Sequence, residues 1–273
     1  MTNKLQVANK IEKEQTFDFT FSICTLVTKK TEYQEMLNSF EYKGFTSDLC
    51  EFLYIDNSEN CTFDAYEGLN VFLQKAKGKY VILCHQDIII HDQNKDDLLK
   101  LIIEIDKKDE NWGILGNAGG VNIKWRTNHI TQGEGNTITE KNVPLKVRSL
   151  DENFILVKKS ANLALSRNLN GFHLYGTDIC LIAEILGYNS YVIGFNLLHK
   201  SNGTIDKSFF DSKKNLLKKY NNALRTRFMS STISRFCLTG NPFFQVLYNS
   251  KIILYLVRQY YKLTTKTEDY KLK

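Results

Sequence analysis

From Phe19 onwards, apolar residues follow two alternating patterns along the chain. Short unbroken apolar runs, rich in β-branched and aromatic residues, predict strands that are buried on both faces. Longer segments with apolar residues at every third or fourth position predict helices. The strands are expected at 19–27, 51–55, 80–84, 112–115, 154–157 and 191–195, and the helices at 31–40, 62–76, 98–105, 177–186, 209–220 and 221–236. This alternation predicts an α/β fold with a mostly parallel central sheet flanked by helices.

Polar residues follow directly after two of the predicted strands: Asp56-Asn57 after 51–55, and His85-Gln86-Asp87 after 80–84. Right-handed crossovers bring the carboxyl ends of parallel strands to one edge, so we expect these residues to lie near each other. Open α/β sheets bind their ligands at that edge. A carboxylate there can hold a hard divalent cation beside substrate phosphates. The alternative is that these are ordinary turn residues at strand ends.

Two later residues carry candidate chemistry. Asp178 is expected in the first turn of a helix capped by Thr177 and ended by Gly187. Its charge either complements the helix dipole, for at most about 1 kcal/mol, or faces a cleft as a general base. His199 follows the strand 191–195; a lone histidine there is usually structural, and it becomes of interest because Asp87 needs a second protein ligand.

The charge, the cysteine spacing and the glycine pattern disfavour several classes of binding site. The 273-residue chain has a net charge of +6, and no basic stretch is regularly interleaved with aromatic residues, so we expect no nucleic-acid partner. Its six cysteines occur singly, without a C-x-x-C pair, which disfavours a zinc or redox motif and favours free thiols in a reducing compartment. Neither a dinucleotide-binding G-x-G-x-x-G sequence nor a P-loop occurs.

No signal peptide or membrane-spanning run is apparent, so the sequence predicts a cytoplasmic protein. The glycine group 116–120 is expected to be a flexible turn, and the polar stretch 122–147 either a lid over a site or a passive insertion.

Residues 243–261 are rich in aromatic and aliphatic side chains, with basic residues close behind. They fit an amphipathic helix on the inner membrane surface, or a helix packed on the catalytic domain or in a homodimer.

A series of short segments between about residue 19 and residue 204 carries a family resemblance. The segments are Ile55-Asp56-Asn57-Ser58, Asn70, Ala76-Lys77-Gly78-Lys79-Tyr80, His85-Gln86-Asp87, Leu150-Asp151-Glu152, Phe172-His173-x-Tyr175-x-x-Asp178 and His199-x-Ser201-x-Gly203. In this order and spacing they resemble the bacterial family 2-like glycosyltransferases. The closer resemblance is to the subgroup with His-Gln-Asp in place of Asp-x-Asp.

The resemblance implies a GT-A fold over residues 19–204, preceded by an N-terminal tail, residues 1–18, and followed by a C-terminal helical extension, residues 205–273. It also implies roles for particular residues. In the donor site, Asp56 would contact the uracil or ribose with Asn57 beside it, Gln86 would replace the first acid of the metal motif, and Asp151 would touch donor sugar or acceptor. Asp87 and His199 would bind Mn²⁺ or Mg²⁺. Asp178 would be the catalytic base. Many relatives have an acid two residues earlier, at the position of Gly176.

The reaction that the resemblance implies is transfer of a sugar from a nucleotide-sugar, UDP-linked, to a hydroxyl of a glycan or lipid-linked acceptor. The product would be inverted at the anomeric carbon and would belong to a surface polysaccharide or lipooligosaccharide. Two other functions stay open. A sugar nucleotidyltransferase is disfavoured because residues 28–31 contain no glycine. A non-catalytic relative that binds a glycan or a partner protein is favoured only by Gln86.

Overall fold

The computed structural model describes residues 15–132, 136–139, 143–201, 203, 205–266 and 270, and only the backbone of residues 136–139. The chain divides into two compact units, Met1–Lys213 and Lys214–Lys273. Of the predicted N-terminal tail, residues 1–14 lie outside the described residues. The predicted limits of the GT-A domain, residues 19 and 204, stay a prediction.

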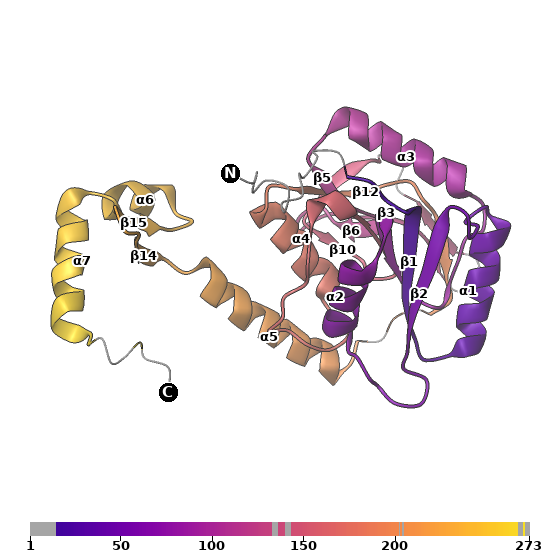
Figure 1. The fold of residues 1–273 in the computed structure, drawn as a ribbon, viewed down its shortest axis with the longest axis horizontal. Helices are drawn as coiled ribbons and strands as arrows, with labels where there is room; N and C mark the ends of the chain where they lie inside the picture. The colour runs from indigo at the N-terminus through magenta and orange to yellow at the C-terminus, as the bar shows by residue number, and fades with distance from the viewer. Residues whose placement is uncertain are drawn as a thin grey trace, which may run out of the picture. The chain divides into compact units, whose positions relative to one another are not determined.

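The first unit is built on a seven-stranded sheet with the strand order β2-β1-β3-β11-β5-β12-β9 (Figure 1). Its strands are β1 (Phe19–Val27), β2 (Cys50–Asp56), β3 (Gly78–Cys84), β5 (Trp112–Gly116), β9 (Leu145–Val147), β11 (Phe154–Lys158) and β12 (Asn189–Val192). Its helices are α1 (Lys30–Tyr42), α2 (Ala65–Lys75), α3 (Lys95–Lys108) and α4 (Tyr175–Ile185), with a 3₁₀ turn at Lys159–Ala161. The predicted α/β class is confirmed.

Helices cover both faces of this sheet. On one face, α1 and α3 pack on the strands through one large apolar cluster, which includes Phe40, Ile102 and the fully buried Trp112. Helices α2 and α4 contact strands through other side chains, such as Phe72 and Ile179, which are also buried. Strands covered on both sides have no polar face, and this explains the unbroken apolar runs in the sequence.

Strand β11 gives the sheet its mixed character. The pairs β1–β2, β1–β3 and β5–β12 are parallel, whereas β11 is antiparallel to both β3 and β5. Phe154, the first residue of β11, pairs with Cys84, the last residue of β3. The residues that lead into β11 therefore lie at the same sheet edge as the residues that follow β3.

A second sheet of six strands contains elements that local patterns did not predict. Its path runs β10 (Ser149–Leu150), β6 (Ala118–Gly120), β7 (Arg126–Gln132), β13 (Leu197–His199) and β4 (Ile88–Ile89), with β8 (Asn136–Thr139) paired to β7. The expected flexible turn at 116–120 thus contains a strand, and the expected irregular stretch 122–147 contains three. The expectation of a turn at 116–120 and of irregular backbone in 122–147 was wrong because pairing with neighbouring strands, in the hairpins β6–β7 and β7–β8, and with the distant β13 supplies the backbone hydrogen bonds of these polar segments.

The second unit holds the hairpin β14 (Arg227–Ser230) and β15 (Arg235–Leu238), followed by α6 (Pro242–Tyr248) and α7 (Lys251–Thr264). Helix α5 (Lys207–Leu224) crosses the boundary between the units. The helix expected at 221–236 was wrong, because Ser231 N–H bonds Ser234 C=O at 2.8 Å and turns the chain into the hairpin. Within the described part of the chain, none of the helices is both long and apolar enough to cross a bilayer.

Replacement of Gly78 by Ala is expected to destabilise the first unit. An added Cβ would lie 2.5 Å from Ser22 N and 2.6 Å from Phe21 C, both backbone atoms of the neighbouring strand β1. Overpacking of this kind costs about 1–3 kcal/mol, and backbone contacts yield less than side chains do. Urea unfolding of Gly78→Ala beside Lys79→Ala, which alters an exposed neighbour, measures the difference. Equal stability of the two variants would contradict this account of the β1–β3 contact.

Candidate active site

Three side chains with metal-binding atoms converge beyond the carboxyl end of β3. His85 Nδ1 lies 3.3 Å from His199 Nε2, and His199 Nε2 lies 3.4 Å from Asp87 Oδ1. One ligand atom from each of the three lies within 4.8 Å of the other two. The predicted pairing of Asp87 with His199 in space is therefore present. The third member is His85, which was named from the sequence only within the segment His85-Gln86-Asp87.

The neighbours of His85 define which of its ring nitrogens is free. Tyr175 Oη–H donates to the carbonyl oxygen of Glu152 at 3.1 Å, so its single hydrogen is used there. The contact of 3.0 Å between Tyr175 Oη and His85 Nε2 must then have the imidazole as donor. Burial, and then the neighbouring His199, lower the pKa of His85, which keeps its ring neutral. Nδ1 of His85 consequently presents a lone pair toward Asp87 and His199.

Asp87 remains ionised in this partly buried position. Burial works to raise its pKa, but the hydrogen bond and charge of His199, together with a hydrogen bond from Ser201, outweigh burial and lower it. The backbone is fixed as well, because Lys200 N–H donates to the Asp87 carbonyl at 3.1 Å. A carboxylate flanked by two imidazoles fits a divalent transition metal, since imidazole suits such ions and magnesium prefers an all-oxygen shell.

A cavity of about 370 Å³ adjoins this cluster and is lined by residues from β1, α1, α2, β3 and the start of α4. Gln86 holds one wall of it in place. Its side-chain oxygen accepts hydrogen bonds from Thr28 N–H at 2.7 Å and Lys29 N–H at 2.9 Å. Its amide nitrogen donates to Thr28 Oγ1 at 3.0 Å and Glu32 Oε2 at 3.1 Å. A carboxylate could not donate these last two bonds, so the amide at this position has a structural reason.

The predicted donor-binding pair at the end of β2 has two different environments. Asp56 is exposed and lies 2.8 Å from Lys30 Nζ; hydrogen bonds from Lys30 and Ser58 lower its pKa. Asn57 is buried, and its side chain bonds backbone groups of Phe63 and Thr62 at 2.8 Å and 2.9 Å. Asp56 thus offers a carboxylate to a ligand, whereas the Asn57 side chain is engaged in shaping the loop that follows.

The residues before β11 bring two more carboxylates to this edge. His85 N–H donates to the Asn153 carbonyl at 3.0 Å, which ties the segment to β3. Asp151 is exposed, accepts a hydrogen bond from Asn153 N–H at 3.0 Å, and lines a separate hollow beside β6 and β7. Glu152 points to the start of α4 and accepts a hydrogen bond from Gly176 N–H at 3.3 Å. Glu152 was not singled out from the sequence, because only the antiparallel course of β11 places it here.

Glu152 is a carboxyl group with a strongly altered acidity. Burial raises its pKa to about 8; backbone hydrogen bonds at the start of α4 oppose the rise, and the charge of Asp151 adds to it. Gly176 permits this arrangement, because a Cβ there would lie 2.4 Å from Leu150 O and 3.3 Å from Glu152 Cγ. Glu152 therefore occupies space next to residue 176 that a larger side chain would need.

Asp178 lies apart from the converging group. Its side chain is 0% exposed, and its two oxygens accept hydrogen bonds from Ser166 N–H at 2.8 Å and Ser166 Oγ–H at 2.7 Å. Helix α4 begins at Tyr175 after Leu174, so the predicted cap at Thr177 was wrong. The geometry indicates that Asp178 fastens the loop around Ser166 to α4. The base role that the resemblance implies for it is untested by this arrangement and is not supported by it.

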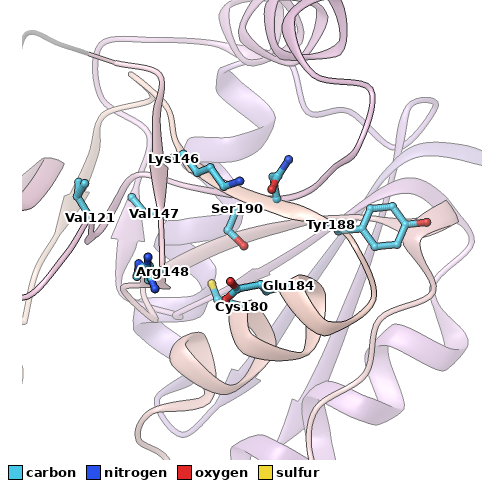
Figure 2. A pocket seen from close by; sticks show the side chains of 9 residues that line it. Val121, Lys146, Val147, Arg148, Cys180, Glu184, Tyr188 and Ser190 are labelled. Carbon is cyan, nitrogen blue, oxygen red and sulfur yellow. The ribbon is translucent and has the colours of Figure 1, made fainter. Parts of the chain in front are cut away.

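Another hollow, of about 320 Å³, lies between β9, β12 and the outer side of α4 (Figure 2). Figure 2 shows Cys180 and Glu184 projecting from the helix below Ser190, with Lys146 and Arg148 above and beside them. None of the residues predicted for the site lines this hollow. The candidate site is therefore the cluster beyond β3 with its adjoining cavity.

Comparisons with known proteins give one related sequence and several weak structural likenesses. No protein-family model matches the chain. Among solved structures, residues 1–349 of TarS from S. aureus have a TM-score of 0.47 at 14% identity, covering 76% of this chain and 72% of that one. A mannosyltransferase from Pyrobaculum calidifontis, PcManGT, solved with GDP-Man and Mn²⁺, has a TM-score of 0.48 at 10% identity, covering 93% and 81%. These TM-scores lie below 0.5, so the likenesses carry no argument about this chain.

The sequence relative is a protein of Fuscovulum blasticum named "ATP synthase subunits region ORF 6". It is 35% identical over 226 residues, which cover 81% of this chain and 91% of the relative. Similarity of this extent, over nearly the whole of both chains, shows common descent. The chain belongs to the family of ATP synthase subunits region ORF 6.

Proposed function

We propose that this protein is a GT-A glycosyltransferase that moves a sugar from a nucleotide-sugar to an acceptor hydroxyl with the help of a divalent metal ion. The observation that carries the proposal is the convergence of His85, Asp87 and His199 at the carboxyl edge of the sheet, beside a cavity. Several of the sequence segments that resemble family 2-like glycosyltransferases lie at this edge, among them 55–58 and 85–87, which end β2 and follow β3. The resemblance and the geometry thus point to one place.

The cavity next to the cluster supplies a site for the nucleotide of the donor. Asp56 and Lys30 stand at the neighbouring strand end, and Lys29 lines the cavity wall that Gln86 fixes. In the proposal, Asp56 exchanges its bond with Lys30 for hydrogen bonds to the uracil or ribose of a UDP-sugar. The released ammonium of Lys30 and that of Lys29 then face the diphosphate, which favours an anionic ligand.

The metal site is proposed to hold Mn²⁺ in preference to Mg²⁺, because two of its three ligands are imidazole nitrogens. Bound metal would neutralise the charge that develops on the leaving diphosphate. The residues themselves keep the site ready for a cation. Asp87 stays ionised, and Tyr175 fixes His85 as a neutral ligand by occupying its other ring nitrogen.

We assign the catalytic base to Glu152 in preference to Asp178. The Asp178 oxygens are enclosed and engaged by Ser166, whereas the Glu152 side chain is partly exposed. The backbone carbonyl of Glu152 also accepts the hydrogen bond of Tyr175, which contacts His85, so this residue lies next to the metal cluster. A base works best when its pKa lies near the working pH, and burial brings the pKa of Glu152 to about 8. Glu152 would accept the acceptor's hydroxyl proton as that oxygen attacks the anomeric carbon, which gives inversion by direct displacement.

Two further parts of the proposal concern context. Gln86 was the one feature that favoured a non-catalytic relative, and its four hydrogen bonds give the amide a structural role that is compatible with the proposed catalysis. All six cysteines are free thiols, which supports a location in a reducing compartment such as the cytoplasm. The acceptor, a glycan or a lipid-linked sugar destined for a surface polysaccharide, is proposed on the sequence resemblance alone.

Metal and donor binding are expected to depend on His199 and not on another histidine of the same unit. Wild-type protein should gain thermal stability with UDP or a UDP-sugar when Mn²⁺ is present, by about 2.7 kcal/mol at a ligand concentration of 100 times Kd. His199→Asn should lose the Mn²⁺-dependent part of the shift, and His91→Asn, which alters an exposed histidine, should keep it. Equal shifts in both variants, or none in the wild type, would count against the proposed site.

Replacement of Glu152 by Gln is expected to lower kcat for sugar transfer by about 10²–10⁴-fold, with little change in donor KM. The base acts as a carboxylate, so wild-type activity should rise as the pH increases through about 8, the pKa of Glu152. The Gln variant should not show this rise.

Asp178→Asn should lower the melting temperature, because it disturbs the bonds with Ser166, yet retain kcat in its folded fraction. The reverse outcome, with Asp178→Asn folded but inactive and Glu152→Gln active, would return the base to Asp178.

A further inference from the structure

The second unit has an unusual charge for a chain of this composition. Residues Lys214–Lys273 contain twelve lysine and arginine residues against two acidic residues, Glu268 and Asp269. Residues 1–213 contain 24 basic and 28 acidic residues. From Ser212 to Thr267 the sequence has no acidic residue at all. The net positive charge of the chain therefore comes from the second unit, in which nearly all of the charged residues are basic.

The second unit also buries very little. Cys237 is its only buried residue among those that the structure describes. Helix α7 turns Leu254 and Val257 toward β14, where they line a hollow of about 490 Å³ together with Phe228. Tyr261 of α7 lines the same hollow, but other apolar residues of the helix do not, and aromatic and aliphatic side chains of α6 are exposed as well.

Helix α7 carries an apolar stripe that has no partner within its unit. Ile252, Leu256, Tyr260 and Leu263 are 72%, 55%, 63% and 87% exposed. Spacings of four, four and three residues place them on one side of a helix, over a length of about 16 Å. Lys251, Arg258 and Lys262 lie at helical spacing between this stripe and the side that faces β14, where Arg258 also lines the hollow, and all three are exposed. An apolar stripe bordered by cations is the arrangement of helices that lie in a membrane interface.

We propose that the second unit binds an anionic lipid bilayer, with α7 lying in the plane of the headgroups and its stripe in contact with the acyl chains. Charge favours lipid over a second copy of the chain as the occupant. A second copy of the same face would oppose one basic unit to another, and like charges disfavour that contact. Anionic lipid complements the basic residues while the apolar side chains enter the hydrocarbon boundary. The fourteen residues of α7 are too few to span the hydrocarbon core, which needs about 20.

This inference does not depend on the proposed transfer reaction, because it rests on the second unit alone. If a lipid-linked acceptor is the substrate, binding to the bilayer would bring the site to its surface. The two proposals fail separately: loss of vesicle binding leaves the Mn²⁺ and donor measurements unaffected.

The test is flotation of the full-length protein with vesicles of phosphatidylcholine alone and of phosphatidylcholine mixed with phosphatidylglycerol. We expect at least tenfold more protein bound to the anionic vesicles at about 0.1 M salt, and a large loss at about 1 M, where the Debye length falls to about 3 Å. Equal binding to both vesicles, or no binding to either, would overturn the proposal.

Two sets of variants separate the contributions of stripe and charge. Leu256→Gln with Leu263→Gln, both at exposed positions, should reduce binding at least tenfold, whereas Ile103→Gln, at a 51% exposed position in α3, should not. Lys251→Gln with Arg258→Gln should remove the preference for anionic lipid. Sedimentation velocity without lipid tests the alternative that a second copy covers the stripe. If the protein does not bind vesicles and forms a dimer that Leu256→Gln dissociates, the occupant is a second copy and the lipid proposal is refuted.

Discussion

One backbone hydrogen bond, from His85 N–H to the Asn153 carbonyl, joins the two segments on which the candidate site depends. It continues the antiparallel pairing of β11 with β3 by one residue beyond Phe154 and Cys84. If β11 ran parallel to β3, the residues before it would lie at the opposite edge of the sheet. Because it is antiparallel, Glu152 meets the start of α4 and Tyr175 beside the histidines. The direction of one strand thus decides which carboxylates can act together.

The acid–base character of the site follows from how each polar group is satisfied. Tyr175 has one hydrogen and gives it to a carbonyl, which can only accept, so His85 is left as the donor to Tyr175 and as a lone-pair donor on its other side. Asp87 stays charged next to the histidines, while Glu152, whose pKa is raised by burial and by the charge of Asp151, binds its proton far more tightly. Two carboxyl groups at one edge thereby differ in acidity, which suits the roles we propose for them, one as a cation ligand and one as a base.

The sequence predicted those parts of the fold that leave a local mark. Strand β1 was expected at its observed limits, and β3 and β5 were expected within two residues, because buried strands read as unbroken apolar runs. It raised the pairing of Asp87 with His199 from the need for a second ligand, and the family resemblance supported it. It did not predict β7, whose polar residues become a strand by pairing with β6 and β13, or the site position of Glu152, which depends on strand direction. Both depend on strand pairing, in the β6–β7 hairpin and with the distant strands β13 and β3, which the periodicity of apolar residues does not record.

The charge of the chain shows how an average can conceal its organisation. A net charge of +6 over 273 residues looks like a mild excess that serves solubility. Divided at Lys214, the same residues give a slightly acidic unit that contains the candidate site and a strongly basic unit with few buried side chains. A basic unit with so little core gains little from its own packing, so binding to the proposed bilayer would add to the free energy that holds its exposed apolar helix in place. The basic charge of the second unit and the apolar stripe of α7 both fit the surface of an anionic bilayer, which we propose as the surface that covers this unit.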